Sequence, residues 1–190
     1  MYVTASKRGA AEWHLGDSAK VEVGRKGHFS GYGSFRVYET ATLKIGEGFT
    51  VEDNYQILTP ESTCIVIGDD CMFSWNTIMD SSDHHSIFDV ISGENINSTY
   101  VIEKGRRIVI GNHVWVGKGA CILYNTRIGD GSIVGAMSLV KSEIPNNCIA
   151  AGNPARVIRK NIAWSRKNRA EDIRECGQAY IKYTEETGSI

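Results

Sequence analysis

The sequence MDSSDHHSIFD, near the middle of the chain, concentrates the side chains best suited to acid–base chemistry. Two histidines, His84 and His85, are adjacent, and Asp83 and Asp89 flank them. An imidazole with an unperturbed pKa of about 6.5 can take a proton from a substrate near neutral pH. A neighbouring carboxylate can hold the ring in the useful tautomer, and Asp80 is a third candidate. The segment predicts a general base, although the same carboxylates could simply cap the loop through Asx turns.

A six-residue repeat fills the chain that follows this segment. An aliphatic residue recurs at every sixth position and a small or β-branched residue stands four places after each, while glycine follows four of the six aliphatics. Neither the helical period of 3.6 nor the strand period of 2 produces this pattern. A short strand plus a tight turn does, and three such units would close a triangular coil of about 18 residues. The aliphatic series is Ile110, Val116, Ile122, Ile128, Val134 and Val140.

The same repeat is weaker earlier in the chain. It is visible at Ile45 and Ile67, shifts phase near Pro60, and keeps no clear register over residues 22–44. We expect coils from about 15 to 79 and again from about 108 to 150. The reactive-looking segment therefore opens a break over residues 80–107, and loops of this length inside compact domains are usually functional or disordered.

The end of the chain has a different pattern. Ile173, Cys176, Tyr180 and Tyr183 follow helical spacing, which predicts a C-terminal α-helix closed by Gly188. We expect an all-β domain over 1–160, with the loop inserted at 80–107, and a helical segment over 161–190 that is not a separate domain.

Composition excludes several function classes. The 190 residues carry a formal net charge of −1, which does not favour a nucleic-acid or membrane-surface partner. The N-terminus lacks the apolar run of a signal peptide, and no stretch approaches the length of a membrane-spanning helix. Five widely spaced cysteines without a CxxC pair indicate reduced thiols in a cytoplasmic protein.

Four segments carry a resemblance to a known family: DHHSIFD, NHVWVGKGA, IGDGSIVGAMSLV and AGNPARVIRK. Together with the hexads they resemble the left-handed parallel β-helix acyltransferases of the hexapeptide-repeat superfamily. The closest resemblance is to capsule and surface-polysaccharide O-acetyltransferases, with the maltose and galactoside enzymes next. It implies a left-handed β-helix, a homotrimer with active sites between neighbouring columns, and acetyl transfer from acetyl-CoA to a hydroxyl of a sugar or polysaccharide precursor, without a metal.

The resemblance also implies roles for single residues. The S-D-x-H-S-I pattern of the polysaccharide enzymes matches His85 as general base, whereas a gap-free count against the maltose-type pattern selects His84. Asn97, in the "IN" segment, would bind the acceptor. For Trp75 two interpretations stay open: a wall of the sugar pocket, because aromatic faces suit pyranose rings, or simple packing. His113 is interpreted as a polar turn residue of its hexad.

The donor groove is expected along the second block of hexads. Trp115 would line it, small residues would permit close approach of the pantetheine arm, and basic residues would meet the CoA phosphates. The phosphate contacts depart from the family pattern at Lys141 and Ser142. The matching positions are Trp115, Gly117, Lys118, Ala136, Lys141, Arg156, Arg159 and Lys160.

Three alternatives remain open. A non-catalytic β-helix scaffold would keep the hexads but has no need of the DHHSI, VWVG and NPAR segments. A metal-dependent carbonic-anhydrase-like enzyme needs three converging histidines, and the H-x4-H spacing of that branch is missing. N-acetylation of an amino (nucleotide-)sugar cannot be separated by composition, and the HSI-type loop favours O-acetylation.

Overall fold

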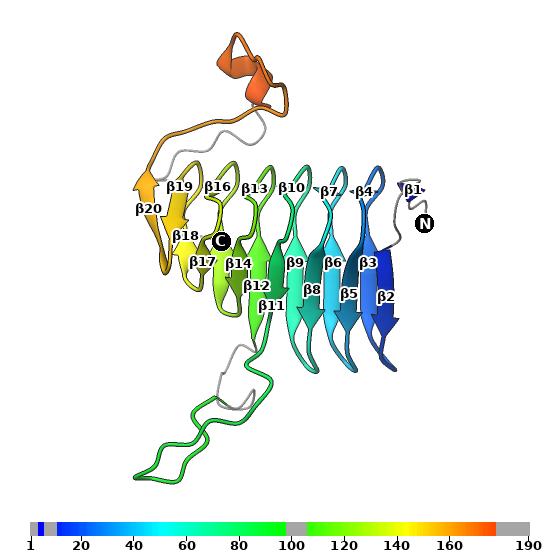
Figure 1. Cartoon of the computed structure of the whole chain (residues 1–190), viewed down its shortest axis with the longest axis vertical. Coiled ribbons are helices and arrows are strands. Elements are labelled where there is room, and N and C mark those ends of the chain that lie inside the picture. Colours follow the sequence, from blue (N-terminus) through cyan, green and yellow to red (C-terminus); the bar gives the residue numbers. More distant parts are fainter. Residues whose placement is uncertain (1–3, 6–10, 98–105, 178–190) are drawn as a thin grey trace.

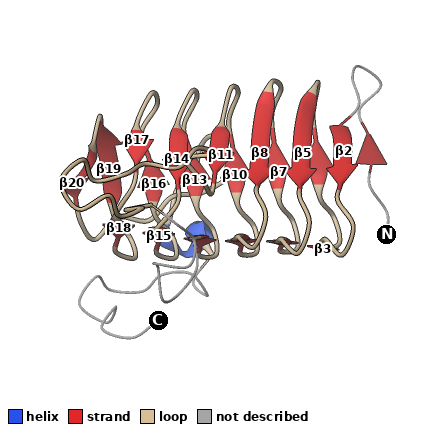
Figure 2. Ribbon diagram, turned by 90° about the horizontal axis from the view of Figure 1, so that it is seen from below, coloured by secondary structure: helices blue, strands red, loops and turns tan. Residues whose placement is uncertain are grey.

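The computed structural model describes residues 4–5, 11–97 and 106–177, and these form three sheets around a triangular column (Figures 1 and 2). The first sheet contains β1 (Thr4–Ala5), β4 (His28–Phe29), β7 (Thr50–Val51), β10 (Met72–Phe73), β13 (Trp115–Val116), β16 (Ile133–Val134), β19 (Ile149–Gly152) and β20 (Ala155–Arg159). The second contains β2 (Ala11–Leu15), β5 (Gly33–Val37), β8 (Tyr55–Thr59), β11 (Ile78–Asp80), β14 (Cys121–Leu123) and β17 (Leu139–Val140). The third contains β3 (Lys20–Val23), β6 (Thr42–Ile45), β9 (Cys64–Ile67), β12 (Arg107–Ile110), β15 (Thr126–Ile128) and β18 (Glu143–Ile144).

The chain visits the three sheets in turn, so each strand pairs with the strand one coil away. These pairs are parallel, and only β19 and β20 pair antiparallel among the described strands. Both hexad series point into the column, as predicted: Val116 and Ile122 are fully buried, and so are Ala120 and Ser132 from the small-residue series. Backbone hydrogen bonds continue through the corners, so the ladder also satisfies the polar groups of the turns.

The first coils are wider than the later ones. More residues separate Phe35 from its partner on the next coil, Ile57, than separate Ile108 from its partner, Thr126. The extra length goes into the strands of the second sheet, which have three residues in β14 but five in β5. The column is thus already present at β2, ahead of the expected start near residue 15. The hexad register fails over 22–44 because those coils are longer than three hexads.

Aromatic rings fill the wider coils. Trp13 stacks on Phe35 with ring centroids 4.0 Å apart, and Phe29 meets both rings edge-on. Phe49 and Phe73 continue the contact into the following coils. Aliphatic side chains of the later hexads need less space, which matches their shorter coils.

Two segments leave the column on opposite sides (Figure 1). The loop between β11 and β12 projects from the turns that lead from the second sheet to the third, here named the loop corner. The segment after β20 runs along the other side and contains one 3-10 helix among the described residues, Ile173–Cys176. This helix ends before Gly177, whose φ of 75° is left-handed, so within the described residues a single 3-10 turn replaces the predicted α-helix. Tyr180, Tyr183 and Gly188 lie outside the described residues.

Trp164 fastens the C-terminal segment to the column. Its ring stacks on His113 with centroids 3.9 Å apart, and its Nε1 donates to the His113 carbonyl. His113 in turn contacts Asp70 at 2.6 Å and the Trp164 carbonyl at 2.9 Å through its two ring nitrogens. Arg166 adds a 2.5 Å contact to Asp70. His113 is therefore a structural turn residue, in agreement with its interpretation from sequence.

None of the helices in the described residues is long and apolar enough to cross a membrane.

Candidate active site

The loop starts from a buried anchor. Ser81, directly after β11, is fully buried, and its hydroxyl shares a 2.6 Å hydrogen bond with that of Thr63 on the previous coil. The projecting residues that follow therefore begin from a fixed point at the loop corner.

Arg106 and Asp83 close the base of the loop. The Arg106 side chain is 3% exposed, lies 3.3 Å from an Asp83 carboxylate oxygen and covers the Tyr124 ring. Tyr124 donates to the same carboxylate at 3.0 Å, and its pKa is raised by burial and by Asp83. The phenol thus stays protonated as a donor. Because the first and last described parts of the loop meet in this network, the histidines between them are held close to the column.

Asn97 links the two sides of the loop. Its amide donates to Asp83 at 3.0 Å and to the His85 carbonyl at 2.8 Å, while its side-chain oxygen accepts from the Ile87 N–H at 2.7 Å. Asn97, which was predicted to bind the acceptor, thus stabilises the backbone around His85.

The two histidines have different surroundings. His84 Nε2 lies 2.7 Å from Asp80, and its backbone has a left-handed φ of 61°. The His85 N–H donates to the Asp83 carbonyl at 2.7 Å, which turns the backbone, but its imidazole has no hydrogen-bond partner among the described residues. One ring is therefore tied to a carboxylate and the other is available to a substrate.

Asp89 lies farther along the loop. It accepts hydrogen bonds from the N–H groups of Ser92 and Ile91, which lower its pKa, and so it caps the loop tip. Among the described residues neither Asp83 nor Asp89 contacts an imidazole. The structure places Asp80, the third candidate, in that position.

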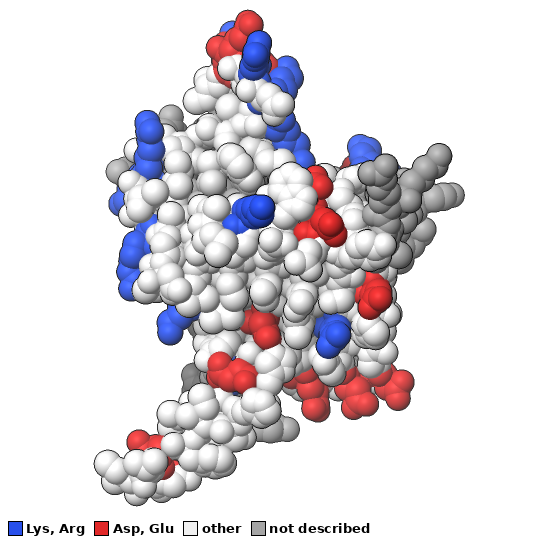
Figure 3. Space-filling model, in the orientation of Figure 1, with Lys and Arg blue, Asp and Glu red and all other residues white. Residues whose placement is uncertain are grey.

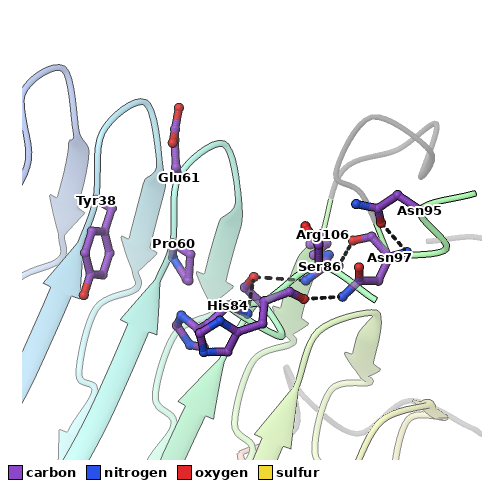
Figure 4. A pocket seen from close by; sticks show the side chains of 10 residues that line it. Tyr38, Pro60, Glu61, His84, Ser86, Asn95, Asn97 and Arg106 are labelled. Carbon is purple, nitrogen blue, oxygen red and sulfur yellow. Dashed lines mark hydrogen bonds between the residues drawn. The ribbon is translucent and has the colours of Figure 1, made fainter. Parts of the chain in front are cut away.

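A polar pocket of about 510 Å³ lies between the loop and the loop corner (Figure 4). Both histidines line it, together with Asn95 and Asn97 from the loop and Tyr38 and Glu61 from the column. Its size and its density of hydrogen-bonding groups suit a hydroxyl-rich small molecule.

The residues predicted to hold the donor gather at another corner, where the turns lead from the first sheet to the second; we name it the tryptophan corner. Trp115 lies on β13 just before this corner, is 38% exposed, and has its ring 5.9 Å from that of Trp164; the turn that follows β13 carries Gly117 and exposed Lys118. The next coil comes so close that a Cβ on Gly117 would lie 2.7 Å from the Ala136 nitrogen. Only glycine fits this approach.

Trp75 also lies at the tryptophan corner, where its carbonyl accepts from the Gly119 N–H at 2.8 Å. It is 49% exposed and does not line the histidine pocket. The structure thus groups Trp75 with the predicted donor residues, across the second sheet from the acceptor pocket.

The predicted phosphate contacts divide between two places. Arg156 and Arg159 lie on β20 and Lys160 follows it, all exposed, at the end of the column where Lys and Arg side chains gather (Figure 3). Lys141 follows β17 and so lies at the loop corner instead. Within one chain, Lys141 is not brought together with Trp115.

Sequence reasoning missed Arg106, Tyr124 and Tyr38. The first two act through contacts between distant segments, which no local spacing encodes. Tyr38 was missed because the hexad register is lost over residues 22–44, and its place one coil before Pro60 follows from the strand pairing. Among the described residues no group of His, Cys, Asp or Glu could hold a metal ion.

Known proteins resemble the chain over both sequence and fold. The family model "Bacterial transferase hexapeptide (six repeats)" matches residues 107–142. A polysialic acid O-acetyltransferase of Escherichia coli O1:K1 is 35% identical over 144 residues, which cover 74% of this chain and 45% of that protein. A galactoside O-acetyltransferase of Lactococcus lactis is 33% identical over 60% of this chain and 51% of its own length. The chain thus spans about half the length of these relatives.

A solved structure of the polySia-specific acetyltransferase NeuO superposes with a TM-score of 0.69 and 25% identity, covering 92% of this chain and 91% of that one. This similarity and the three-sheet topology confirm the predicted all-β column. The hexads of residues 107–142 belong to the hexapeptide-repeat family of bacterial transferases, and the repeats of the chain wind into a left-handed parallel β-helix.

Proposed function

We propose that the protein transfers an acetyl group from acetyl-CoA to a hydroxyl of a sugar or polysaccharide precursor. The observation that carries this is the polar pocket at the loop corner, which presents two histidines, one of them backed by a carboxylate, to a space of sugar size. The O-acetyltransferases among the relatives support the reaction class.

We assign the general base to His85. In His84 the nitrogen at the tip of the ring is taken by Asp80, which leaves only Nδ1, next to its own backbone, to face a substrate. Among the described residues the His85 ring makes no hydrogen bond, and it lines the same pocket. His85 would take the hydroxyl proton as the oxygen attacks the thioester carbonyl, and the proton would pass to the departing CoA thiolate. The specific observation that favours His84 as a second candidate is its carboxylate partner, which would hold the ring in one tautomer.

We place the donor at the tryptophan corner. Trp115 and Lys118 are exposed there, and the close backbone approach at Gly117 leaves a surface against which a pantetheine arm could lie. Arg156, Arg159 and Lys160 would bind the phosphates. The two corners lie on opposite edges of the second sheet, which supports a homotrimer in which Trp115 of one copy faces the loop of the next. Free cysteines at all five positions support a reducing compartment such as the cytoplasm.

The test is a transfer assay with thiol detection. Purified protein, acetyl-CoA and a panel of sugars should release CoA thiol only when an acceptor is present, and the product should gain one acetyl ester. An alkali-stable amide on an amino sugar would overturn the O-acetyl assignment in favour of N-acetylation. Absence of transfer to every acceptor, with no acetyl-CoA binding, would leave the column as a scaffold.

A further inference from the structure

A second groove continues from the histidine pocket along the loop corner. It has a volume of about 350 Å³, is lined by His14, Leu15, Arg36 and Tyr38, and shares Tyr38 with the first pocket. The two hollows therefore meet at a single side chain.

The wider first coils create this continuity. Gly16, Tyr38 and Pro60 occupy the same corner position on three successive coils, because Leu15 pairs with Val37 and Val37 with Thr59. Gly16 has no side chain, so the space beside Tyr38 stays open on that coil. A Cβ there would lie 2.6 Å from the Glu39 nitrogen, which keeps the position small.

Tyr38 presents an aromatic surface to this space. It is 44% exposed, and its hydroxyl has no hydrogen bond among the described residues. Figure 4 shows its ring on the column, on the same side as Pro60 and His84. An aromatic face is electron-rich, and the C–H groups on one side of a pyranose ring suit it.

The distance along the corner matches a chain of sugars. β5, which precedes Tyr38, and β11, which precedes the loop, are separated by two coil steps of about 4.8 Å each, or about 10 Å. A pyranose ring bound at the histidines would fill only part of this pocket of about 510 Å³, and its neighbour in an oligosaccharide would extend to Tyr38 and the groove beyond it. Glu61 and Arg36 lie on either side of Tyr38 and offer an acceptor and donors for sugar hydroxyls.

We propose that the acceptor is a glycan chain rather than a free monosaccharide, and that Tyr38 binds the sugar beside the one that reacts. This rests on the proposed function, since it takes the histidine pocket as the acceptor site.

The test uses the full chain with acceptors of graded length. The variants compared are Tyr38→Ala, Tyr38→Phe and the control Tyr32→Ala. Tyr32 is a suitable control because it is 71% exposed and lies directly before β5, whereas Tyr38 lies directly after it, so the two tyrosines are at opposite edges of the second sheet. The probes are a printed array of neutral and sialylated oligosaccharides from one to eight units, and transfer kinetics with the same glycans. Wild type should favour longer acceptors in binding and in kcat/KM. Tyr38→Ala should reduce that length preference about tenfold, and Tyr38→Phe should retain it because the ring remains.

Four results would overturn the inference about Tyr38 or the proposed function on which it rests. Equal use of one-unit and longer acceptors by wild type, or an undiminished length preference in Tyr38→Ala, would overturn the inference while leaving acetyl transfer intact. A loss in Tyr32→Ala as large as in Tyr38→Ala would also overturn it. Absence of binding and transfer with every glycan would overturn the acceptor side of the proposed function, and this inference with it.

Discussion

His84 Nε2 lies 2.7 Å from the carboxylate of Asp80, four residues earlier and at the end of β11. The contact joins His84, on the loop, to Asp80, the last residue of the column before the loop. It distinguishes the two adjacent histidines, because among the described residues the ring of His85 has no hydrogen-bond partner at either nitrogen.

The first prediction separates the two histidines. His85→Ala should lower kcat about 10³-fold, the usual range for loss of a general base. His84→Ala should lower it about tenfold, because it removes a neighbour and a loop contact but not the base. Steady-state kinetics with saturating acetyl-CoA measure both, and circular dichroism controls for folding. A larger loss in His84→Ala than in His85→Ala would reverse the assignment.

The second prediction concerns Arg106. Arg106→Met removes the buried cation that faces Asp83 and leaves that carboxylate without its charged partner, so the base of the loop should loosen. We expect faster proteolysis within residues 82–97 and a lower kcat. Arg107→Met is the matched control, since Arg107 is exposed on β12. Equal protection of the loop in both variants would contradict the role given to Arg106.

The third prediction concerns pH and the C-terminal segment. Burial alone would raise the pKa of Asp70, but hydrogen bonding to His113 and the nearby Arg166 lower it overall. A depressed carboxylate pKa stabilises the folded contact above the unfolded value, and this stabilisation is lost as pH falls through the folded value. The protection factors of the amides in residues 161–167, which correct for the pH dependence of intrinsic exchange, should therefore fall on acidification below about pH 4, near the ordinary pKa of Asp.

Asp70→Asn is the control for that measurement. It should show faster exchange over 161–167 at neutral pH and a weaker response to acid. Unchanged exchange in this variant would show that Trp164 stacking alone holds the segment.

The fourth prediction concerns acceptor charge. Asp17, Glu39 and Glu61 occupy the same position on successive coils at the loop corner, and all three are exposed. Acidic side chains gather along that edge of the column (Figure 3). Arg106, the cation that lines the pocket, is already engaged by Asp83.

A neutral oligosaccharide should therefore be a better acceptor than a sialylated one of equal length. The difference should shrink as ionic strength rises, because salt screens the repulsion between exposed charges. Glu61→Gln should also reduce the difference in activity between neutral and sialylated acceptors. Preference for the sialylated acceptor at low salt would contradict this reasoning.

The later coils could be predicted from sequence because each hexad fills one side of the triangle. Ile122 and Val134 are buried where the hexads placed them. The early coils could not be predicted in this way. Their strands in the second sheet are longer, so each coil exceeds three hexads and the six-residue register is lost. The paired aromatics Trp13 and Phe35, one coil apart, were the available signal.

The candidate site divides in the same way. The break in the repeat located the loop and its two histidines, but not the partner of His84, because Asp80, Asp83 and Asp89 are all near in sequence. Loop geometry selects among them: Asp83 is drawn to Arg106, and Asp89 to backbone N–H groups at the tip. The position of Trp75 depends on which corner its turn joins, and hydrophobic periodicity does not report that.

Calorimetric titration of the intact protein with acetyl-CoA tests the central claim most directly. Saturable binding near one molecule per chain, weakened by Trp115→Ala but not by His85→Ala, is the predicted result. Absence of binding at millimolar acetyl-CoA would contradict the acetyltransferase assignment.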